Sequence, residues 1–193
     1  MDAWRPPSKD EIIGLFREAL DQTAGRADMF PDDGPGWTKE QFTDLRRLIE
    51  DRCRGEDAEC RNWVGYGHRD KTPRSDCRFQ AGGEWLYDFT WIQYSRKGEM
   101  LAMPLAIESE YHRDQREVVY ELEKLMASRA LVRAVVFQTP ETATREMLEH
   151  HIRTSPIAAD SDVYLFAFWD NAQKQYRTWR FEAWMDEAKL LSD

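Results

Sequence analysis

The feature that most constrains the fold is a predicted hairpin that is followed by a helix and then by a short apolar strand. The hairpin spans about 84–111, with its turn at Arg96–Glu99, the helix spans 113–129, and the strand spans Val132–Gln138. A hairpin is antiparallel, whereas a strand that continues through a helix into its neighbour joins two parallel strands. This order therefore predicts a mixed sheet with helices on its faces.

The rest of the chain adds helices and a second hairpin around this centre. Ser8 is a good N-cap for an amphipathic helix over Lys9–Gln22, which a Gly- and Pro-rich loop follows. Further predicted elements are a helix over Lys39–Arg54, a strand over Asn62–Gly67, an irregular basic segment over 68–83, a helix over Pro140–Arg153, strands over Asp162–Trp169 and Gln175–Phe181, and a short helix over Glu182–Leu191. We expect residues 1–37 to form an N-terminal helix and loop, and residues 38–193 to form a single α/β (α+β) domain that ends in a β-hairpin.

Composition limits the class of protein. The net charge of −9 argues against binding nucleic acid through overall positive charge, although a local basic groove remains compatible with it. No apolar run approaches the ~18–20 residues that cross a bilayer. The first residues lack the apolar stretch of a signal peptide. We therefore expect a cytoplasmic protein that does not enter a membrane.

The cysteines indicate neither a disulfide framework nor a common zinc fold. Cys53, Cys60 and Cys77 are odd in number, and no signal peptide accompanies them. Together with His68 they would supply four zinc ligands, but none of the pairs has the short C-x2-4-C spacing of common zinc folds. Reduced thiols in or near the core are the favoured interpretation.

Three carboxylates mark the hairpin as the candidate functional site. Asp88 is on the first predicted strand, and Glu108 and Glu110 are on the second, where alternation points both to the same face. Together they would form the oxygen-rich pocket that hard cations such as Mg2+ prefer. Two plainer interpretations stay open. Glu108 and Glu110 would lie on a solvent-exposed face if Leu105 and Ile107 face the core, and Asp88 would cap a turn or pair with an arginine.

The element order and these acids resemble the PD-(D/E)xK (restriction-endonuclease-like) nuclease superfamily, whose core is helix, three strands, helix, strand (αβββαβ). The resemblance covers about Thr38–Gln138. Asp88 matches the acid of the second strand, and Glu108 matches the first acid of the acid-x-Lys motif on the third. Glu110 stands where the lysine is usual, as in E-x-E variants of the superfamily.

Other members of the superfamily carry the lysine on the following helix, where Lys124 is the candidate. Helical spacing sets Lys124 roughly opposite the stripe of Val118, Leu122 and Met126. We therefore expect Lys124 to face solvent, and we favour Glu110 in the lysine's role.

The resemblance implies Mg2+- or Mn2+-dependent hydrolysis of nucleic acid, with DNA favoured over RNA. Asp88, Glu108 and the backbone carbonyl of Ser109 would hold the metal, and Glu110 or Lys124 would act on the attacking water. Candidates for contact with the phosphate backbone are Lys71, Arg74, Arg78, Arg96 and Lys97. Two alternatives remain: an inactive nuclease-like fold that binds a partner protein in a defence or toxin–antidote system, and a small-molecule phosphohydrolase. A homodimer is also compatible with the sequence.

Overall fold

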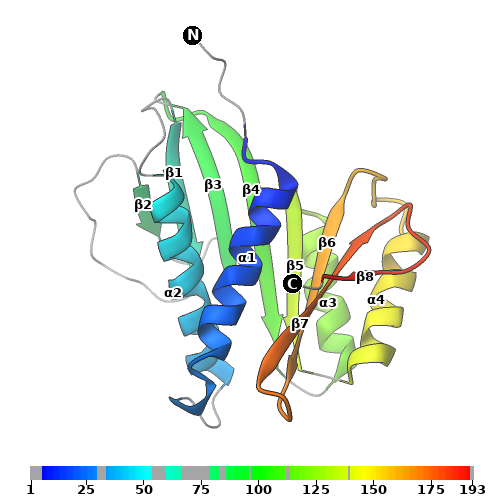
Figure 1. Cartoon of the computed structure of the whole chain (residues 1–193). Helices are drawn as coiled ribbons and strands as arrows, with labels where there is room; N and C mark the ends of the chain where they lie inside the picture. The colour runs from blue at the N-terminus through cyan, green and yellow to red at the C-terminus, as the bar shows by residue number, and fades with distance from the viewer. Residues whose placement is uncertain are drawn as a thin grey trace.

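The computed structural model describes residues 6–29, 34–53, 60–66, 79–82, 86–95, 97–111, 114–138 and 140–191. The described strands form one eight-stranded sheet in the order β2-β1-β3-β4-β5-β6-β7-β8. The elements are α1 (Lys9–Ala24), a 3-10 turn (Ala27–Met29), α2 (Gly34–Cys53), β1 (Cys60–Tyr66), β2 (Phe79–Gly82), β3 (Phe89–Ser95), β4 (Met100–Glu110), α3 (Gln115–Met126), β5 (Val132–Phe137), α4 (Glu141–Thr154), β6 (Val163–Asp170), β7 (Gln175–Glu182) and β8 (Lys189–Leu190) (Figure 1).

The sheet is mixed, as the element order predicts. β3 is antiparallel to both β1 and β4, whereas β4, β5 and β6 are parallel and are connected through α3 and α4. β6 and β7 form the expected C-terminal hairpin. The succession α2, β1, β3, β4, α3, β5 is the expected order of helix, three strands, helix and strand, with β2 added as an edge strand parallel to β1.

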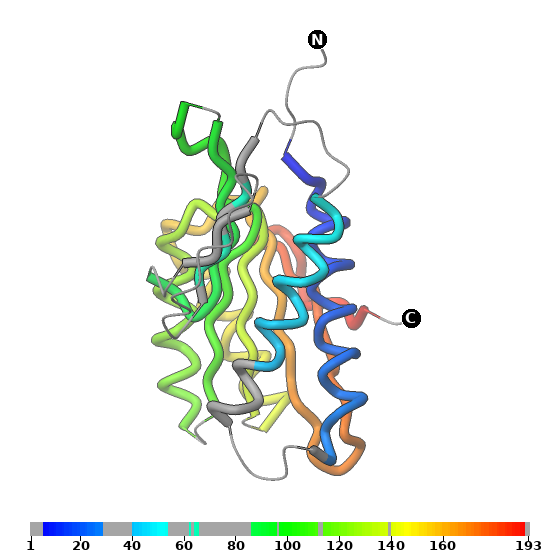
Figure 2. Tube along the Cα trace, turned by 90° about the vertical axis from the view of Figure 1, so that its left-hand side faces the viewer, coloured from blue at the N-terminus to red at the C-terminus, as the bar shows by residue number. Residues whose placement is uncertain are grey.

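Helices cover both faces of the sheet. Figure 2 shows α1 and α2 on one side of the sheet and α3 on the other, and Figure 1 shows α4 beside α3. Two apolar clusters correspond to these layers, one built on α1 and α2 and the other on α3 and α4. Because both faces are covered, every residue of β5 is buried, and its sequence is apolar apart from Arg133, as is typical of a parallel strand.

The structure corrects four details of the expected elements. The first strand of the hairpin begins at Phe89 rather than near residue 84, so Asp88 lies in the bend before β3 and not on the strand. α2 begins at Gly34 rather than after residue 37, and Pro35 fits the first turn because no intrahelical partner is needed there. Residues 79–82 form β2, although the whole of 68–83 was expected to be irregular. The helix expected over 182–191 is absent. Turns and β8 replace it, because Met185 and Ala188 pack into the core while the backbone amide of Leu191 bonds to Thr178.

Pro104 lies in β4, where its missing N–H predicts irregular pairing. The pairing of β3 with β4 shifts between Trp91 and Tyr94, opposite the stretch that contains Pro104. The register is regular again nearer the other end of the hairpin, where Phe89 pairs with Ile107. The irregularity therefore leaves the end that carries the acids undisturbed.

Candidate functional site

The β3–β4 hairpin brings Asp88 and Glu108 together. Phe89 pairs with Ile107, and Asp88 lies in the bend immediately before β3, where its contacts are with Glu108 and Ser109 of β4. The backbone N–H of Asp88 donates a long hydrogen bond of 3.4 Å to Glu108 Oε2. Ser109 holds the Asp88 carboxylate in place, because its N–H and its hydroxyl both donate to Asp88 Oδ2, at 2.9 and 2.7 Å.

Glu108 is a buried acid on the face of β4 that α3 covers. Its exposed fraction is 1%, whereas Leu105 and Ile107 contribute to the apolar cluster on the opposite face. The interpretation of Glu108 as a solvent-exposed residue is therefore wrong, because helices cover both faces of this strand. A buried carboxylate needs a partner, since an isolated charge in the interior is costly.

Lys124 supplies that partner. Its Nζ lies 2.6 Å from Glu108 Oε1 and 2.6 Å from Glu121 Oε2, one turn earlier on α3. The expectation that Lys124 faces solvent is wrong: its side chain is 34% exposed and its ammonium group lies against the strand. The reason is the length of the lysine stem, which lets a residue that lies off the buried stripe reach back toward the sheet.

Burial has the largest effect on the pKa of the Glu108 carboxyl. It raises the pKa of the carboxyl, the hydrogen bond to Lys124 lowers it, and the neighbouring Asp88 and Glu121 carboxylates raise it further, to about 8. For Lys124, burial lowers the pKa, but its hydrogen bonds to Glu108 and Glu121 outweigh burial and raise it above the ordinary value. Lys124 therefore remains a cation at neutral pH, while Glu108 binds a proton readily.

The expected pocket of three converging carboxylates is not formed. Glu110 is half-buried at the end of β4, two residues beyond Glu108 and therefore on the same face. Among the described residues, which include all three acids, there is no group of three or more His, Cys, Asp or Glu side chains close enough to share a metal ion. The candidate site consists instead of Asp88, which contacts Glu108, and of Lys124, which α3 brings against Glu108 and Glu121.

The sequence did not predict the parts that four residues play at or beside the site. These residues are Glu121, Tyr87, Arg133 and Ser109, the last as a hydrogen-bond donor to Asp88. The contact of Glu121 with Lys124 could have been predicted from the sequence, because a Glu and a Lys three residues apart on a helix are neighbours on its surface. Tyr87 is buried, and burial and the nearby Glu108 carboxylate raise the pKa of its hydroxyl. The partners of Arg133 could not have been predicted, since an arginine inside an apolar strand does not identify the groups that it contacts.

Most of the expected cationic contacts lie outside the described residues, namely Lys71, Arg74, Arg78 and Arg96. Lys97 is exposed in the turn between β3 and β4. That turn is at the opposite end of the hairpin from Asp88, and the seven residues of β3 span roughly 23 Å at ~3.3 Å per residue. Lys97 is therefore too far from the acids to contact a phosphate bound between them.

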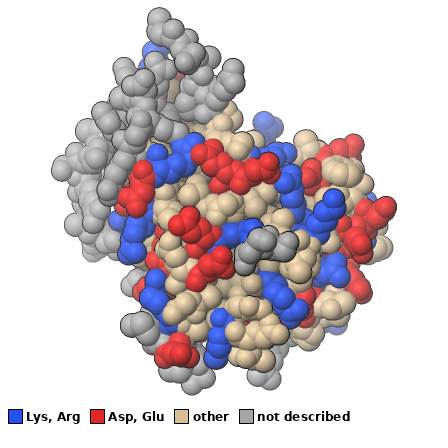
Figure 3. Space-filling view, viewed as in Figure 1, with Lys and Arg blue, Asp and Glu red and all other residues tan. Residues whose placement is uncertain are grey.

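The cysteines and the surface charges add no second site. Cys53 is buried at the end of α2 and Cys60 begins β1, while Cys77 and His68 lie outside the described residues. Figure 3 shows acidic and basic side chains interspersed over the described part of the face that it views. In the described part of the chain, no helix is both long and apolar enough to span a membrane.

Comparisons with known proteins give little further information. No family model matches the sequence, and no curated protein matches it. Among solved structures, the cAAA-bound form of NucC from E. coli MS115-1 has a similar chain trace, with a TM-score of 0.38 and 7% identical residues over 94% of this chain and 86% of that one. Similarity at this level says nothing about the chemistry of the site.

Proposed function

We propose that this protein hydrolyses phosphodiester bonds of nucleic acid with a divalent metal ion, Mg2+ or Mn2+, at Asp88, Glu108 and Lys124. The observation that carries the proposal is that Asp88 contacts both Glu108 and Ser109 at the start of the β3–β4 hairpin, with the Lys124 ammonium 2.6 Å from Glu108. Two acids and a lysine are the functional set of the PD-(D/E)xK motif that the sequence resembles. The order of helix, three strands, helix and strand around them supports the same assignment.

The residues present fit a small divalent cation. Mg2+ in proteins is typically bound by one or two carboxylates and keeps several waters, so a third acid is unnecessary. Glu108 Oε1 is a buried oxygen whose neighbour is the Lys124 ammonium group at 2.6 Å, so this oxygen already lies beside a cation. Asp88 and Glu108 would hold the ion, and the carbonyl of Ser109 is a further proposed ligand. A bound ion would lower the pKa of a water and offset charge on the phosphate.

The protein's own groups have distinct tasks in this proposal. Ser109 fixes the Asp88 carboxylate through its N–H and its hydroxyl, so that the ligand is oriented before substrate arrives. Lys124 keeps its proton, so we assign it the stabilisation of negative charge on the phosphate rather than proton abstraction. Glu110 remains the proposed group that orients or deprotonates the attacking water.

The proposed substrate is DNA in preference to RNA, contacted through the basic candidates Lys71, Arg74, Arg78, Arg96 and Lys97. One observation favours the alternative of an inactive fold that binds a partner protein. In the described part of the chain, the acids of this site make only a pair, and that pair already has a lysine counter-ion. An inactive protein would retain this ion pair and would not need a metal.

Cleavage assays with matched variants test the proposal. Single- and double-stranded DNA and RNA are incubated with the protein and Mg2+, Mn2+ or chelator. We expect metal-dependent cleavage that Asp88→Asn, Glu108→Gln and Lys124→Met each reduce by at least ~100-fold, a loss typical of removing a group that acts on the reacting atoms. Glu99→Gln changes an exposed residue at the far end of the hairpin and should retain full activity.

The two functions predict opposite results. Wild-type rates in both Asp88→Asn and Glu108→Gln, with the fold intact by circular dichroism, would show the nuclease proposal to be wrong. Absence of any divalent-ion binding in calorimetry, together with a stable complex with a protein from the same cells, would favour the protein-binding alternative.

A further inference from the structure

Lys124 is held between two carboxylates that belong to different elements. Glu108 comes from β4 and Glu121 from the same helix as Lys124, and each has an oxygen 2.6 Å from Nζ. The Glu121 side chain is only 15% exposed. Exposed ion pairs at this helical spacing contribute little, but here the Glu121 carboxylate is mostly buried and the pair lies beside the proposed reaction centre.

We propose that Glu121 is a positioning residue that keeps the Lys124 ammonium group at the site when Glu108 is occupied by a divalent cation. The inference deepens the proposed function and rests on it for its catalytic consequence. The anchoring of Lys124 by Glu121 is, however, a property of the metal-free protein as well.

The physical argument starts from what a metal ion would do to the ion pair. A divalent cation on Glu108 would take up the charge that attracts Lys124, and it would also repel the ammonium group at short range. A lysine has a flexible stem and a strongly hydrated head, so without a second partner it would turn toward solvent. Glu121 is that second partner, and it is fixed to Lys124 by the geometry of one helical turn.

Glu121 should also affect how strongly Lys124 competes with the metal. With Glu121 present, the ammonium is shared between two carboxylates; without it, Lys124 would bind to Glu108 alone. Loss of Glu121 also removes a negative charge near the proposed metal. Both effects weaken metal binding, whereas loss of Lys124 removes the competing cation and strengthens it. A purely structural role for Glu121 predicts neither change.

The first experiment needs no metal. The Lys124 ammonium signal is followed by 1H–15N NMR in the unchanged protein and in variants, with Glu108→Gln imitating a Glu108 whose charge is neutralised. We expect the signal in the unchanged protein and in Glu108→Gln, and its loss in the double variant Glu108→Gln/Glu121→Gln. Disappearance of the signal in Glu108→Gln alone, or its survival in the double variant, would overturn the inference.

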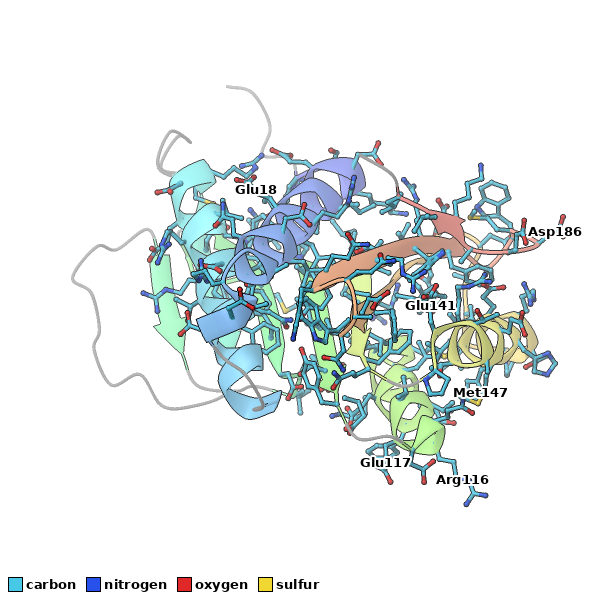
Figure 4. All side chains as sticks on the ribbon, turned by 60° about the horizontal axis from the view of Figure 1, so that its bottom comes forward. Glu18, Arg116, Glu117, Glu141, Met147 and Asp186 are labelled. Atoms are coloured by element: carbon cyan, nitrogen blue, oxygen red, sulfur yellow. The ribbon has the colours of Figure 1, made fainter. Side chains whose placement is uncertain are left out.

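The second experiment measures Mn2+ affinity by calorimetry. We expect Kd to rise about 5-fold in Glu121→Gln and to fall several-fold in Lys124→Met, the size expected for adding or removing one partly screened charge contact. Glu117→Gln is the matched control, because it removes the same charge one turn earlier on α3 at a side chain that points outward (Figure 4). A Kd in Glu121→Gln equal to that of the control would contradict the inference.

The two experiments separate this inference from the proposed function. If the unchanged protein binds no Mn2+, the proposed function is wrong, and the ammonium signal alone decides whether Glu121 anchors Lys124. If Mn2+ binds and cleavage occurs but the affinities of Glu121→Gln and Glu117→Gln agree, the proposed function stands and the role of Glu121 does not.

Discussion

Arg133 Nε on β5 donates a hydrogen bond of 3.1 Å to the backbone carbonyl of Leu125, the residue that follows Lys124 on α3. The same guanidinium donates to the carbonyl of Ser128 at 2.9 Å and pairs with Asp162 at 3.0 Å. Carbonyls in the last turn of a helix lack intrahelical partners, and a cation there also interacts favourably with the helix dipole. This buried arginine therefore fixes the end of α3 that carries Lys124 to the sheet that carries Glu108.

Replacing Arg133 with methionine should destabilise the fold and displace Lys124. Arg133 is 5% exposed, and breaking a largely buried ion pair together with the hydrogen bonds to the Leu125 and Ser128 carbonyls costs about 3 kcal/mol. Urea denaturation measures the loss of unfolding free energy. Arg129→Met, at an exposed position in the same connection, should change it by less than about 0.5 kcal/mol. Equal stability of the two variants would refute this anchoring role.

The raised pKa of Glu108 predicts a pH-dependent stability. Between its ordinary value of 4.5 and about 8, the folded protein holds a proton that the unfolded chain has released, so the unfolding free energy falls as pH rises. Glu108→Gln should match the unchanged protein near pH 5 and exceed it at pH 9 by on the order of 1–4 kcal/mol. Thermal unfolding from pH 5 to 9, with Glu117→Gln as control, measures the difference. Parallel stability curves would contradict the prediction.

Metal binding should release a proton. Near pH 7 the Glu108 carboxyl is below its pKa of about 8, and a divalent cation can bind it only after the proton has left. We expect Mn2+ affinity to rise between pH 6 and 8 and to level off above. Calorimetry in buffers of different ionisation enthalpy gives the number of protons released, which should approach one near pH 6.5 and be zero in Glu108→Gln. Affinity that is independent of pH over this range would speak against Glu108 as a ligand.

Ser109→Ala should loosen the orientation of Asp88 without unfolding the protein. The hydroxyl contributes the 2.7 Å hydrogen bond to Asp88 Oδ2, while the backbone N–H keeps its own at 2.9 Å. We expect a loss of about 1 kcal/mol in stability and a reduction of roughly 10-fold in the rate of metal-dependent cleavage, because the ligand is less well oriented. Ser109→Thr keeps a hydroxyl and should recover most of the rate. A variant with an unchanged rate would assign Ser109 a structural role only.

Much of the fold could be predicted because it depends on local patterns. The apolar runs of β5 and β6, the stripe of α3 that includes Val118 and Leu122, and the Ser8 cap each occur within one short segment, and each formed the expected element. The segment over 182–191 was mispredicted because its helical spacing competes with contacts made far away in sequence. The backbone amide of Ala188, for example, bonds to Glu149 on α4.

In the candidate site, too, some features follow from local sequence patterns and others from contacts between distant segments. The sequence by itself determined that Asp88 and Glu108 share a hairpin and that Glu108 and Glu110 alternate onto one face, because hairpin pairing and strand alternation are local rules. Only the tertiary structure decided that α3 covers this face, that Glu108 is consequently buried with a raised pKa, and that Lys124 rather than a third carboxylate lies against Glu108. The physical reason is that burial and the reach of a lysine depend on how the helix packs on the sheet. No local pattern in the sequence specifies that packing.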